Sequence, residues 1–235
     1  MLRNFIFKIT LYTWFLLWTP ILAVGLISSR LERRLMLIET FGVLSLARNL
    51  GGIKYEIIYP KKDENGIPFK HNVNSRLDGR TIIASKHMSI MEVAILFYHV
   101  PKSFFILKRE LLWIPVYGWA FARIGLIGVN RSRGKTNMKD LVNRVTKKIM
   151  NDMTLIIFPE GTRVKPNQNV PLKRGLLFIA EQLKLPITPV GVDTGLYWPK
   201  RGRIHPGTTK VYFEPELPSS ASMDDIRSAI NKHSC

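Results

Sequence analysis

Cysteine is almost absent from this chain of 235 residues, and the single one, Cys235, is the last residue. One thiol can form neither an intrachain disulfide framework nor a cysteine-based zinc site, so both are excluded. Acidic side chains are also scarce, with 17 Asp and Glu against 35 Lys and Arg, and the formal net charge is +18. Such a surface attracts anions, which include nucleic acids, anionic lipid headgroups and phosphorylated substrates.

The sequence also lacks internal repeats, low-complexity segments and the helix-turn-helix, zinc-finger or RNP-like patterns of nucleic-acid-binding modules. The nucleic-acid explanation of the positive charge is therefore weakened, and we expect no nucleic-acid partner. No group of side chains shows the spacing of metal ligands, so we expect no metal site.

One long stretch, Ile9 to Ile27, carries no charged side chain over nineteen positions. As a helix it would extend about 29 Å, close to the ~30 Å hydrocarbon core of a bilayer. A cleaved signal peptide is the alternative, with Ala23, Val24 and Gly25 as a small-residue cleavage site. Because the stretch is long for a signal peptide and arginines follow at once, we favour a transmembrane helix at about residues 9–29.

Residues 30–50 carry apolar side chains at helical spacing among several arginines. This pattern fits an amphipathic helix at the membrane interface, and it fits equally well a helix packed on the core of a domain. We expect a membrane anchor over residues 1–52, made of the transmembrane helix and the interfacial helix, followed by one domain over residues 53–235.

Predicted strands and helices alternate through the second part of the chain. The predicted strands are 55–59, 81–85, 103–107, 126–130, 154–158, 187–192 and 208–214, and the predicted helices are 89–99, 111–124, 135–150, 174–184 and one that starts at Ser222. Continuously apolar strands such as 154–158 are typical of a sheet covered on both faces. The alternation predicts an α/β fold with a mostly parallel sheet flanked by helices, preceded by the membrane-associated helical segment.

His87 lies between a predicted strand and a predicted helix, and Glu92 follows five residues later. Ser89 and Glu92 fit a capping box, in which the Ser89 hydroxyl accepts from the N–H of residue 92 and the Glu92 carboxylate accepts from the N–H of Ser89. The capping box does not explain His87. The N-terminus of a helix disfavours an imidazolium, whereas a nearby carboxylate orients the ring, so the pair is a candidate base for activating a hydroxyl. Because the chain has no Gly-x-Ser-x-Gly elbow, that hydroxyl would belong to the substrate.

A second polar cluster, Pro159 to Arg163, follows the predicted strand 154–158. Pro159 ends the strand, Gly161 permits a tight turn, and the Arg163 guanidinium suits a phosphate group. The simpler alternative is a solvated turn in which Glu160 and Arg163 pair with each other. Ligands of open α/β sheets bind at the carboxyl ends of the strands, which is where this cluster lies.

These motifs resemble the glycerolipid acyltransferase family, and most closely its 1-acyl-glycerol-3-phosphate (lysophosphatidate) acyltransferases. The first motif of that family is His, four residues and an acid, as in KHMSIME here, and the third, FPEGTR, is complete at 158–163. KRELLWIPVYG with GLIGVNR is similar to the second motif, and LPITPVGV is similar to the fourth. Two positions depart from the pattern, since Glu92 replaces the usual Asp and Lys86 the usual Asn.

The resemblance implies transfer of an acyl group from acyl-CoA or acyl-carrier protein to the sn-2 hydroxyl of lysophosphatidate, which makes phosphatidate in phospholipid biosynthesis. It implies His87 as general base with Glu92 as its orienting partner. The substrate-binding residues that it implies are Lys108, Arg131, Glu160, Gly161, Thr162 and Arg163, with Lys108 and Arg163 holding the phosphate. No cofactor is expected beyond the thioester co-substrate.

The resemblance also implies a membrane-associated enzyme, which we expect at a bacterial inner membrane with the catalytic domain facing the cytoplasm. Within the family, the acceptor could be another glycerolipid or lysolipid. From a different class, the chain could be a non-catalytic, membrane-anchored basic protein that binds anionic lipid or nucleic acid. That alternative predicts salt-sensitive binding to any polyanion and no dependence on His87, and it leaves the PEGTR turn unexplained.

Overall fold

The structure, a computed structural model, describes residues 2–60, 81–130 and 138–233. The strands are β1 (Ile53–Ile58), β2 (Ile82–Ser85), β3 (Ser103–Lys108), β4 (Ile127–Val129), β5 (Thr154–Ile157), β6 (Ile187–Val192) and β7 (Gly207–Phe213). The helices are α1 (Leu2–Gly25), α2 (Ser29–Asn49), α3 (Met91–His99), the 3-10 helix η2 (Arg109–Trp113), α4 (Tyr117–Arg123), α5 (Met138–Ile149), α6 (Gly175–Leu183), α7 (Thr194–Tyr197) and α8 (Met223–Asn231).

The strands form one sheet in the order β1-β7-β6-β2-β5-β3-β4. β6 and β7 are antiparallel, and every other neighbouring pair is parallel. The predicted fold class, a mostly parallel sheet flanked by helices, is therefore confirmed. β2, β5 and β3 lie side by side and run in one direction, so the segments that follow them leave the sheet at the same edge.

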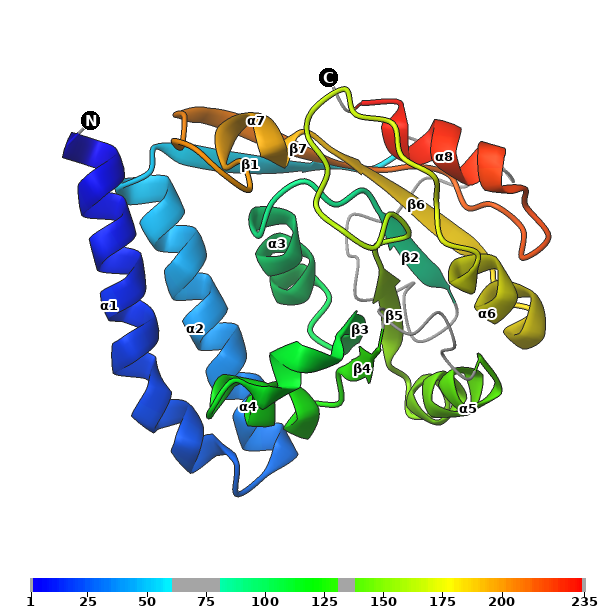
Figure 1. Cartoon of the computed structure of the whole chain (residues 1–235), viewed down its shortest axis with the longest axis horizontal. Helices are drawn as coiled ribbons and strands as arrows, with labels where there is room; N and C mark the ends of the chain where they lie inside the picture. The colour runs from blue at the N-terminus through cyan, green and yellow to red at the C-terminus, as the bar shows by residue number, and fades with distance from the viewer. Residues whose placement is uncertain (1, 61–80, 131–137, 234–235) are drawn as a thin grey trace.

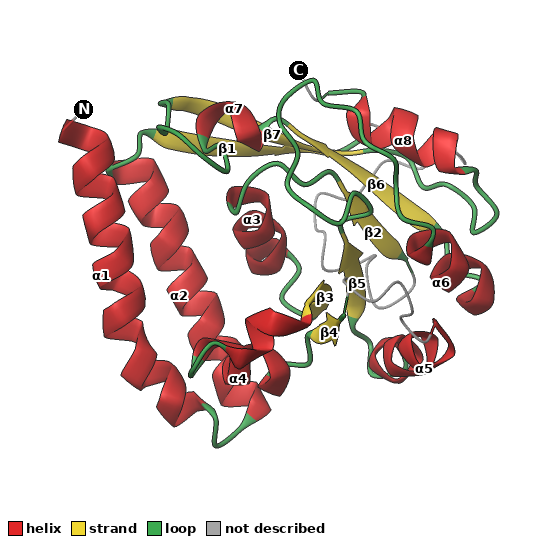
Figure 2. Ribbon diagram, viewed as in Figure 1, coloured by secondary structure: helices red, strands yellow, loops and turns green. Residues whose placement is uncertain are grey.

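Each central strand contributes to two hydrophobic cores, because successive side chains of a strand point to opposite faces. In β5, Leu155 belongs to one core and Ile156 to the other, and neither side chain is exposed. One core lies between the sheet and α2, α3 and α4, and the other lies between the sheet and α5, α6 and α8 (Figures 1 and 2). This explains why the strands read as continuous apolar stretches rather than as alternating ones.

The helix expected over residues 111–124 is interrupted, so this prediction is wrong in its middle. η2 ends at Trp113 and α4 begins at Tyr117. Pro115 between them has no N–H to donate and disfavours a helical conformation at Ile114, which has a ψ of 120°. Val116 then takes a positive φ of 62° and is the N-cap of α4.

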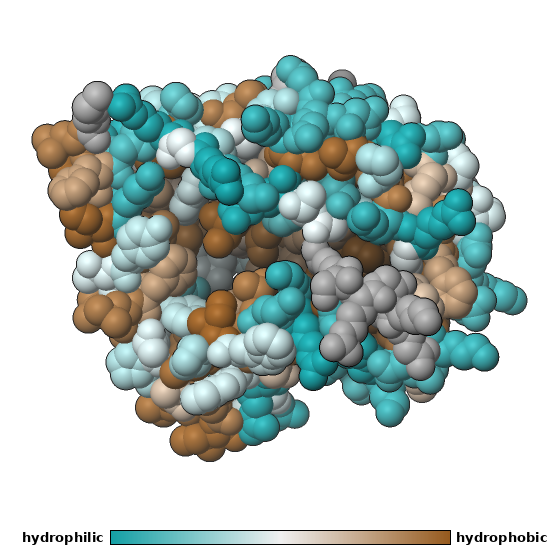
Figure 3. Space-filling model, in the orientation of Figure 1, coloured by the Kyte–Doolittle hydropathy of each residue, from teal (hydrophilic) through white to brown (hydrophobic). Residues whose placement is uncertain are grey.

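α1 runs from Leu2 to Gly25, whereas the prediction was residues 9–29. By length and composition it is the one helix within the described residues that could cross a membrane. Phe7, Leu11 and Leu22 are buried against the rest of the protein. The opposite side is apolar and exposed, as the brown left edge of Figure 3 shows, and consists of Leu2, Phe5, Ile6, Ile9, Tyr12, Leu16, Leu17, Ile21 and Val24.

α2 pairs with α1 and also packs on the domain. Its residues Met36, Val43, Leu44 and Ala47 are part of the core that α3 shares. Arg33 donates hydrogen bonds of 2.8 and 2.9 Å to the carbonyl oxygens of Pro101 and Ser103. One face of α2 is therefore part of the domain core, and the other face stays exposed.

Candidate active site

The carboxyl ends of the neighbouring strands β2 and β5 bring the two sequence motifs together. The backbone N–H of His87 donates to Glu160 Oε2 at 2.8 Å, and the N–H of Val164 donates to the carbonyl of His87 at 2.8 Å. His87 is thus fastened through its backbone to the segment that follows β5. The two motifs, predicted to lie at one edge of the sheet, form a single site.

His87 Nδ1 lies 2.8 Å from Glu92 Oε1. The Glu92 side chain is fully buried, whereas 19% of the His87 side chain is exposed. A carboxylate only accepts hydrogen bonds, so this contact assigns the proton to Nδ1 and leaves Nε2 as the acceptor nitrogen. The ring of Phe158 stacks on the imidazole with centroids 4.2 Å apart and an interplanar angle of 24°. The predicted pairing of His87 with Glu92 therefore exists, with a partly accessible ring.

Glu92 is held from several directions. Oε1 accepts from the N–H groups of Met88 and Ser89 at 2.8 Å each, in addition to His87. Oε2 accepts from the N–H of Ser89 at 2.9 Å and from the Thr194 hydroxyl at 2.6 Å. Both oxygens are thereby fixed, so the carboxylate cannot turn away from the imidazole.

Thr194 is a site residue that the sequence reasoning missed. It is fully buried and opens α7, directly after Asp193 and the end of β6. It lies 102 residues from Glu92 in the chain. The available signal was its position just beyond the strand of the fourth motif, at the same edge of the sheet as His87.

The predicted capping box is half correct. Glu92 accepts from the N–H of Ser89 as expected, but the Ser89 hydroxyl accepts from the N–H of Met91 at 3.1 Å instead of from residue 92. α3 begins only at Met91, with Ile90 as its N-cap. Glu92 already binds the backbone of residues 88 and 89, which keeps this segment out of the helix. The Glu92 carboxylate therefore binds the backbone just before α3 and orients His87 at the same time.

Glu160 is buried, with 4% of its surface exposed. Burial raises the pKa of Glu160 to about 8, and the negative charge of Glu92 acts in the same direction. The hydrogen bond from the His87 N–H and the positive charge of Lys86 oppose that rise in pKa. The alternative of a solvated turn with a Glu160–Arg163 pair is wrong, because Glu160 faces the protein interior and binds the His87 backbone.

The rest of the PEGTR turn is nearer to the surface. Gly161 has a φ of 70°, a conformation that favours glycine, and its N–H donates to the carbonyl of Phe158 at 3.0 Å. Thr162 is exposed and Arg163 is half-buried. Glu160 therefore points inward, while Thr162 and part of Arg163 are accessible at the surface.

Lys108 is the last residue of β3, the strand next to β5. Its ammonium is 3.4 Å from Glu110, and 56% of its side chain is exposed. Lys108 thus ends β3 and Arg163 lies in the turn that follows β5, so both come after strand ends at the edge of the sheet that carries His87. Arg131, the remaining predicted binding residue, lies outside the described residues.

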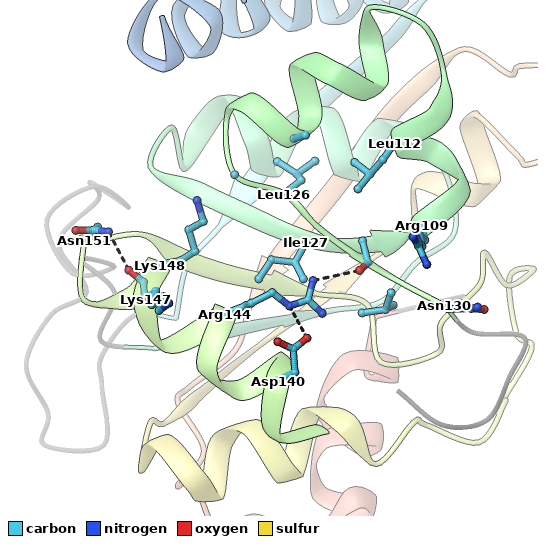
Figure 4. Close-up of a pocket in the computed structure, with 14 residues that line it drawn as sticks. Arg109, Leu112, Leu126, Ile127, Asn130, Asp140, Arg144, Lys147, Lys148 and Asn151 are labelled. Carbon is cyan, nitrogen blue, oxygen red and sulfur yellow. Dashed lines mark hydrogen bonds and ion pairs between the residues drawn. The ribbon is translucent and has the colours of Figure 1, made fainter. Parts of the chain in front are cut away.

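A separate groove of about 760 Å³ follows the outer edge of β4 (Figure 4). Its charged lining residues are Arg109, Asp140, Arg144, Lys147 and Lys148. Arg144 pairs with Asp140 at 3.0 Å and donates to the carbonyl of Gly128 at 3.4 Å. His87 and Glu160 do not line this groove, so the histidine site and the groove are distinct. Across the described ranges, no group of three His, Cys, Asp or Glu side chains is placed to hold a metal ion.

The fold and the site place the chain in a known class of proteins. The sequence pattern of the Acyltransferase family matches residues 67–193, which is more than half of the chain, and the chain belongs to that family. A 1-acyl-sn-glycerol-3-phosphate acyltransferase of Pseudomonas aeruginosa is 34% identical over 173 residues, covering 73% of this chain and 62% of that protein. One from Cocos nucifera is 34% identical over 143 residues, covering 58% of this chain and 46% of that protein.

The fold has a counterpart among solved structures. The crystal structure of the 1-acyl-sn-glycerophosphate (LPA) acyltransferase PlsC from Thermotoga maritima superimposes with a TM-score of 0.69 at 20% identity, covering 98% of this chain and 94% of that one. At this identity the likeness concerns the fold. The chain spans 62% and 46% of the length of the two sequence relatives named above, so their full activity is not transferred by the match alone.

Proposed function

We propose that the chain is a 1-acyl-sn-glycerol-3-phosphate O-acyltransferase, which transfers an acyl group from acyl-CoA or acyl-carrier protein to the sn-2 hydroxyl of lysophosphatidate. The observation that carries the proposal is the 2.8 Å contact between His87 Nδ1 and the buried carboxylate of Glu92, at the carboxyl edge of the sheet. A base held in this way activates a hydroxyl group. The names of the relatives supply the acceptor.

In the proposed reaction, His87 Nε2 takes the proton of the sn-2 hydroxyl while the hydroxyl oxygen attacks the thioester carbonyl carbon. The new C–O bond gives a tetrahedral intermediate, whose collapse breaks the C–S bond. The leaving thiolate takes the proton from the imidazolium, so the products are an ester and a thiol. Glu92 stabilises the imidazolium, and a base of this kind contributes roughly 10²–10⁴-fold in rate.

The acceptor phosphate would lie between the ends of β3 and β5. Lys108 and Arg163 flank this part of the edge, and Arg131 is the further candidate from the sequence. A guanidinium binds phosphate through paired N–H groups, and an ammonium acts as a point charge. Acyl-CoA and acyl-carrier protein present the same thioester to His87, so the chemistry is common to both donors.

The exposed apolar side of α1 is the proposed membrane contact. Near the N-terminal end of α1, Asn4 Oδ1 accepts from the N–H of Ile204 at 2.7 Å. Just beyond the C-terminal end of α1, the carbonyl of Ile27 accepts from Arg123 at 2.8 Å. A helix that crossed the bilayer would have its ends at opposite surfaces, but here both ends contact the same domain. We therefore favour α1 lying in one leaflet, with the domain on the cytoplasmic side of a bacterial inner membrane.

The test is acyl transfer by the full chain in mixed detergent–lipid micelles, with labelled acyl-CoA or acyl-carrier protein and a panel of acceptors. The panel holds lysophosphatidate, glycerol 3-phosphate, lysophosphatidylcholine and lysophosphatidylethanolamine. We expect phosphatidate formation to exceed every other product. Preference for another acceptor would keep the acyltransferase assignment and replace the substrate. Inactivity with every pair of donor and acceptor would contradict the proposal.

A further inference from the structure

The groove along the outer edge of β4 has no part in the reaction above (Figure 4). β4 is last in the order of the sheet, so none of the described strands covers this edge. η2 and α4 form one wall of the groove through Leu112 and Ala122, and α5 forms the other through Arg144 and Lys148. The volume of about 760 Å³ is that of a pocket for a small ligand.

The groove carries an excess of positive charge. Four cations line it, Arg109, Arg144, Lys147 and Lys148, against one carboxylate, Asp140. Arg144 pairs with Asp140 at 3.0 Å. Within the described parts of the chain, the salt bridges include none of the other three cations. Cations that line a concave surface concentrate anions there, so the groove suits an anionic ligand.

The cations lie toward both ends of β4. A Cβ on Gly125, just before the strand, would collide with Lys148 Nζ, and a Cβ on Gly128 would lie 3.2 Å from the Cα of Arg109. Three residues of extended chain separate the two glycines, which is about 10 Å. Figure 4 shows Arg109 and Lys148 on either side of Ile127, which lines the groove between them. A ligand that fits therefore carries negative charge at two places with a less polar part between.

The groove is separated from the proposed membrane contact by α4. Ala122 of α4 lines the groove, whereas Tyr117 of α4 packs edge-to-face on Phe15 of α1, with ring centroids 5.8 Å apart. α1 and α5 lie at opposite sides of the domain in Figure 1. This position favours a soluble anion over the headgroup of a lipid in the bilayer.

The groove lies within reach of the histidine site. Val129 of β4 pairs with Lys108, the last residue of β3, so one end of the groove is at the edge of the sheet that carries His87. β4, β3, β5 and β2 are consecutive in the sheet, and three strand spacings amount to roughly 14 Å. An extended pantetheine arm spans this distance. A thioester at His87 can therefore belong to a carrier group that is held in the groove.

We infer that the groove binds the adenosine 3′-phosphate 5′-diphosphate end of acyl-CoA. The phosphates of this group lie on both sides of its ribose, which matches cations at both ends of β4. The faces of the adenine ring suit the apolar side chains between them. A carrier protein typically needs a contact surface of about 800 Å² on each partner rather than a groove of small-molecule size. The inference rests on the proposed acyl transfer and narrows its donor to acyl-CoA.

The first test measures binding of free CoA to the full chain in detergent by titration calorimetry and needs no reaction. Arg109→Gln/Lys148→Gln, the groove variant, removes one cation from each end of the groove. The matched control, Lys54→Gln/Lys139→Gln, removes two exposed lysines that do not line the groove, one on the opposite edge strand β1 and one on α5.

We expect the Kd for CoA to rise about three- to tenfold in the groove variant, because partly exposed ion pairs contribute modestly. The control should change the Kd by less than about twofold. Added salt should raise the Kd of the wild type more steeply than that of the groove variant, since fewer charges remain to be screened. Melting temperatures of both variants check that they fold.

The second test compares three donors with the same acyl chain: acyl-CoA, S-acyl-pantetheine, which lacks the nucleotide, and acyl-carrier protein. In the groove variant, the KM for acyl-CoA should rise about three- to tenfold, while the KM for lysophosphatidate stays that of the wild type. With S-acyl-pantetheine, the wild type and the groove variant should have the same KM, because the group that the groove binds is missing.

Two results would overturn the inference. One is a wild type that does not bind CoA, or a groove variant that binds it as tightly as the wild type; the cations would then only protect an exposed edge strand from pairing with another chain. The other is a raised KM for acyl-carrier protein with an unchanged KM for acyl-CoA, which would assign the groove to the carrier protein. A wild type that binds CoA through the groove but transfers no acyl group would contradict the proposed function and keep the CoA site.

Discussion

Within the residues that the structure describes, two histidine–carboxylate pairs have the same separation and different surroundings. His87 Nδ1 lies 2.8 Å from Glu92, and His233 Nε2 lies 2.8 Å from Glu214. In each pair the second carboxylate oxygen has another donor, which is the Thr194 hydroxyl for Glu92 and the Lys232 ammonium for Glu214. Distance alone therefore does not distinguish the two pairs.

The difference lies in burial and in which ring nitrogen is used. Glu92 is fully buried and also accepts from backbone N–H groups, whereas Glu214 is 9% exposed and binds two side chains from the end of the chain. His87 uses Nδ1 for the carboxylate, which leaves Nε2, the nitrogen farther from the backbone, as an acceptor at the carboxyl end of β2. His233 uses Nε2 for the carboxylate and stacks on Tyr212 of β7, with ring centroids 3.9 Å apart. The comparison shows that the pairing alone does not identify a base, and that the proposed role of His87 rests on its position in the fold and on which nitrogen its carboxylate leaves as an acceptor.

The largest expected effect comes from removing each imidazole in turn. His87→Ala should lower kcat for phosphatidate formation by about 10²–10⁴-fold, because the proton acceptor is lost. His233→Ala should change kcat by less than about twofold, since that ring stacks on Tyr212 and its Nε2 is bound to Glu214. Initial rates at saturating donor and acceptor measure both, with circular dichroism to check the fold. Equal losses of kcat in the two variants would contradict the proposed difference between the two histidines.

A smaller effect is expected from the carboxylates. Glu92→Gln keeps the shape, but its amide group places a donor against the donors that surround Glu92. We expect the free energy of unfolding to fall by about 1–3 kcal/mol for the unpaired buried groups. We also expect kcat to fall roughly 10- to 100-fold, because the tautomer of His87 is no longer fixed.

Glu214→Gln is the matched control for Glu92→Gln. It should lose stability, measured by urea unfolding, while kcat stays within about twofold of the wild type. A Glu92→Gln variant with normal kcat would mean that His87 needs no carboxylate. The Glu92→Asp variant carries the acid usual in the resembled family and should retain more activity than Glu92→Gln.

Local sequence patterns predicted much of the fold. The strands were predicted correctly because apolar β-rich stretches between turn residues are local signals. The site motifs were predicted at strand ends because they directly follow such stretches. The long helix across Pro115 failed because apolar spacing outweighed the effect of the proline. α7, from Thr194 to Tyr197, was missed because four residues are too few to show a helical period.

The contacts that complete the site could not be predicted. Thr194 reaches Glu92 across 102 residues, and Lys86 reaches Asn231 across 145. Such pairings depend on the order of strands in the sheet, which spacing along the chain does not reveal. The sequence showed that Lys86 departs from the family pattern, and the structure adds that its ammonium donates to Asn231.

The smallest expected effect comes from removing the donor to the second carboxylate oxygen in each pair. Thr194→Val removes a buried hydroxyl that donates to Glu92 at 2.6 Å and leaves the shape unchanged. A hydrogen bond to a charged group contributes about 1.5–3 kcal/mol, so we expect a stability loss in that range and a fall in kcat of only about two- to fivefold, since His87 and the backbone still hold Glu92.

Lys232→Met removes the corresponding donor to Glu214. Because 60% of the Lys232 side chain is exposed, its loss should lower stability by no more than about 0.5 kcal/mol and leave kcat unchanged. Urea unfolding and kcat, measured for both variants, decide the point. If Lys232→Met costs as much stability as Thr194→Val, burial does not set the strength of these contacts, and the contrast between the two pairs rests on their position in the fold alone.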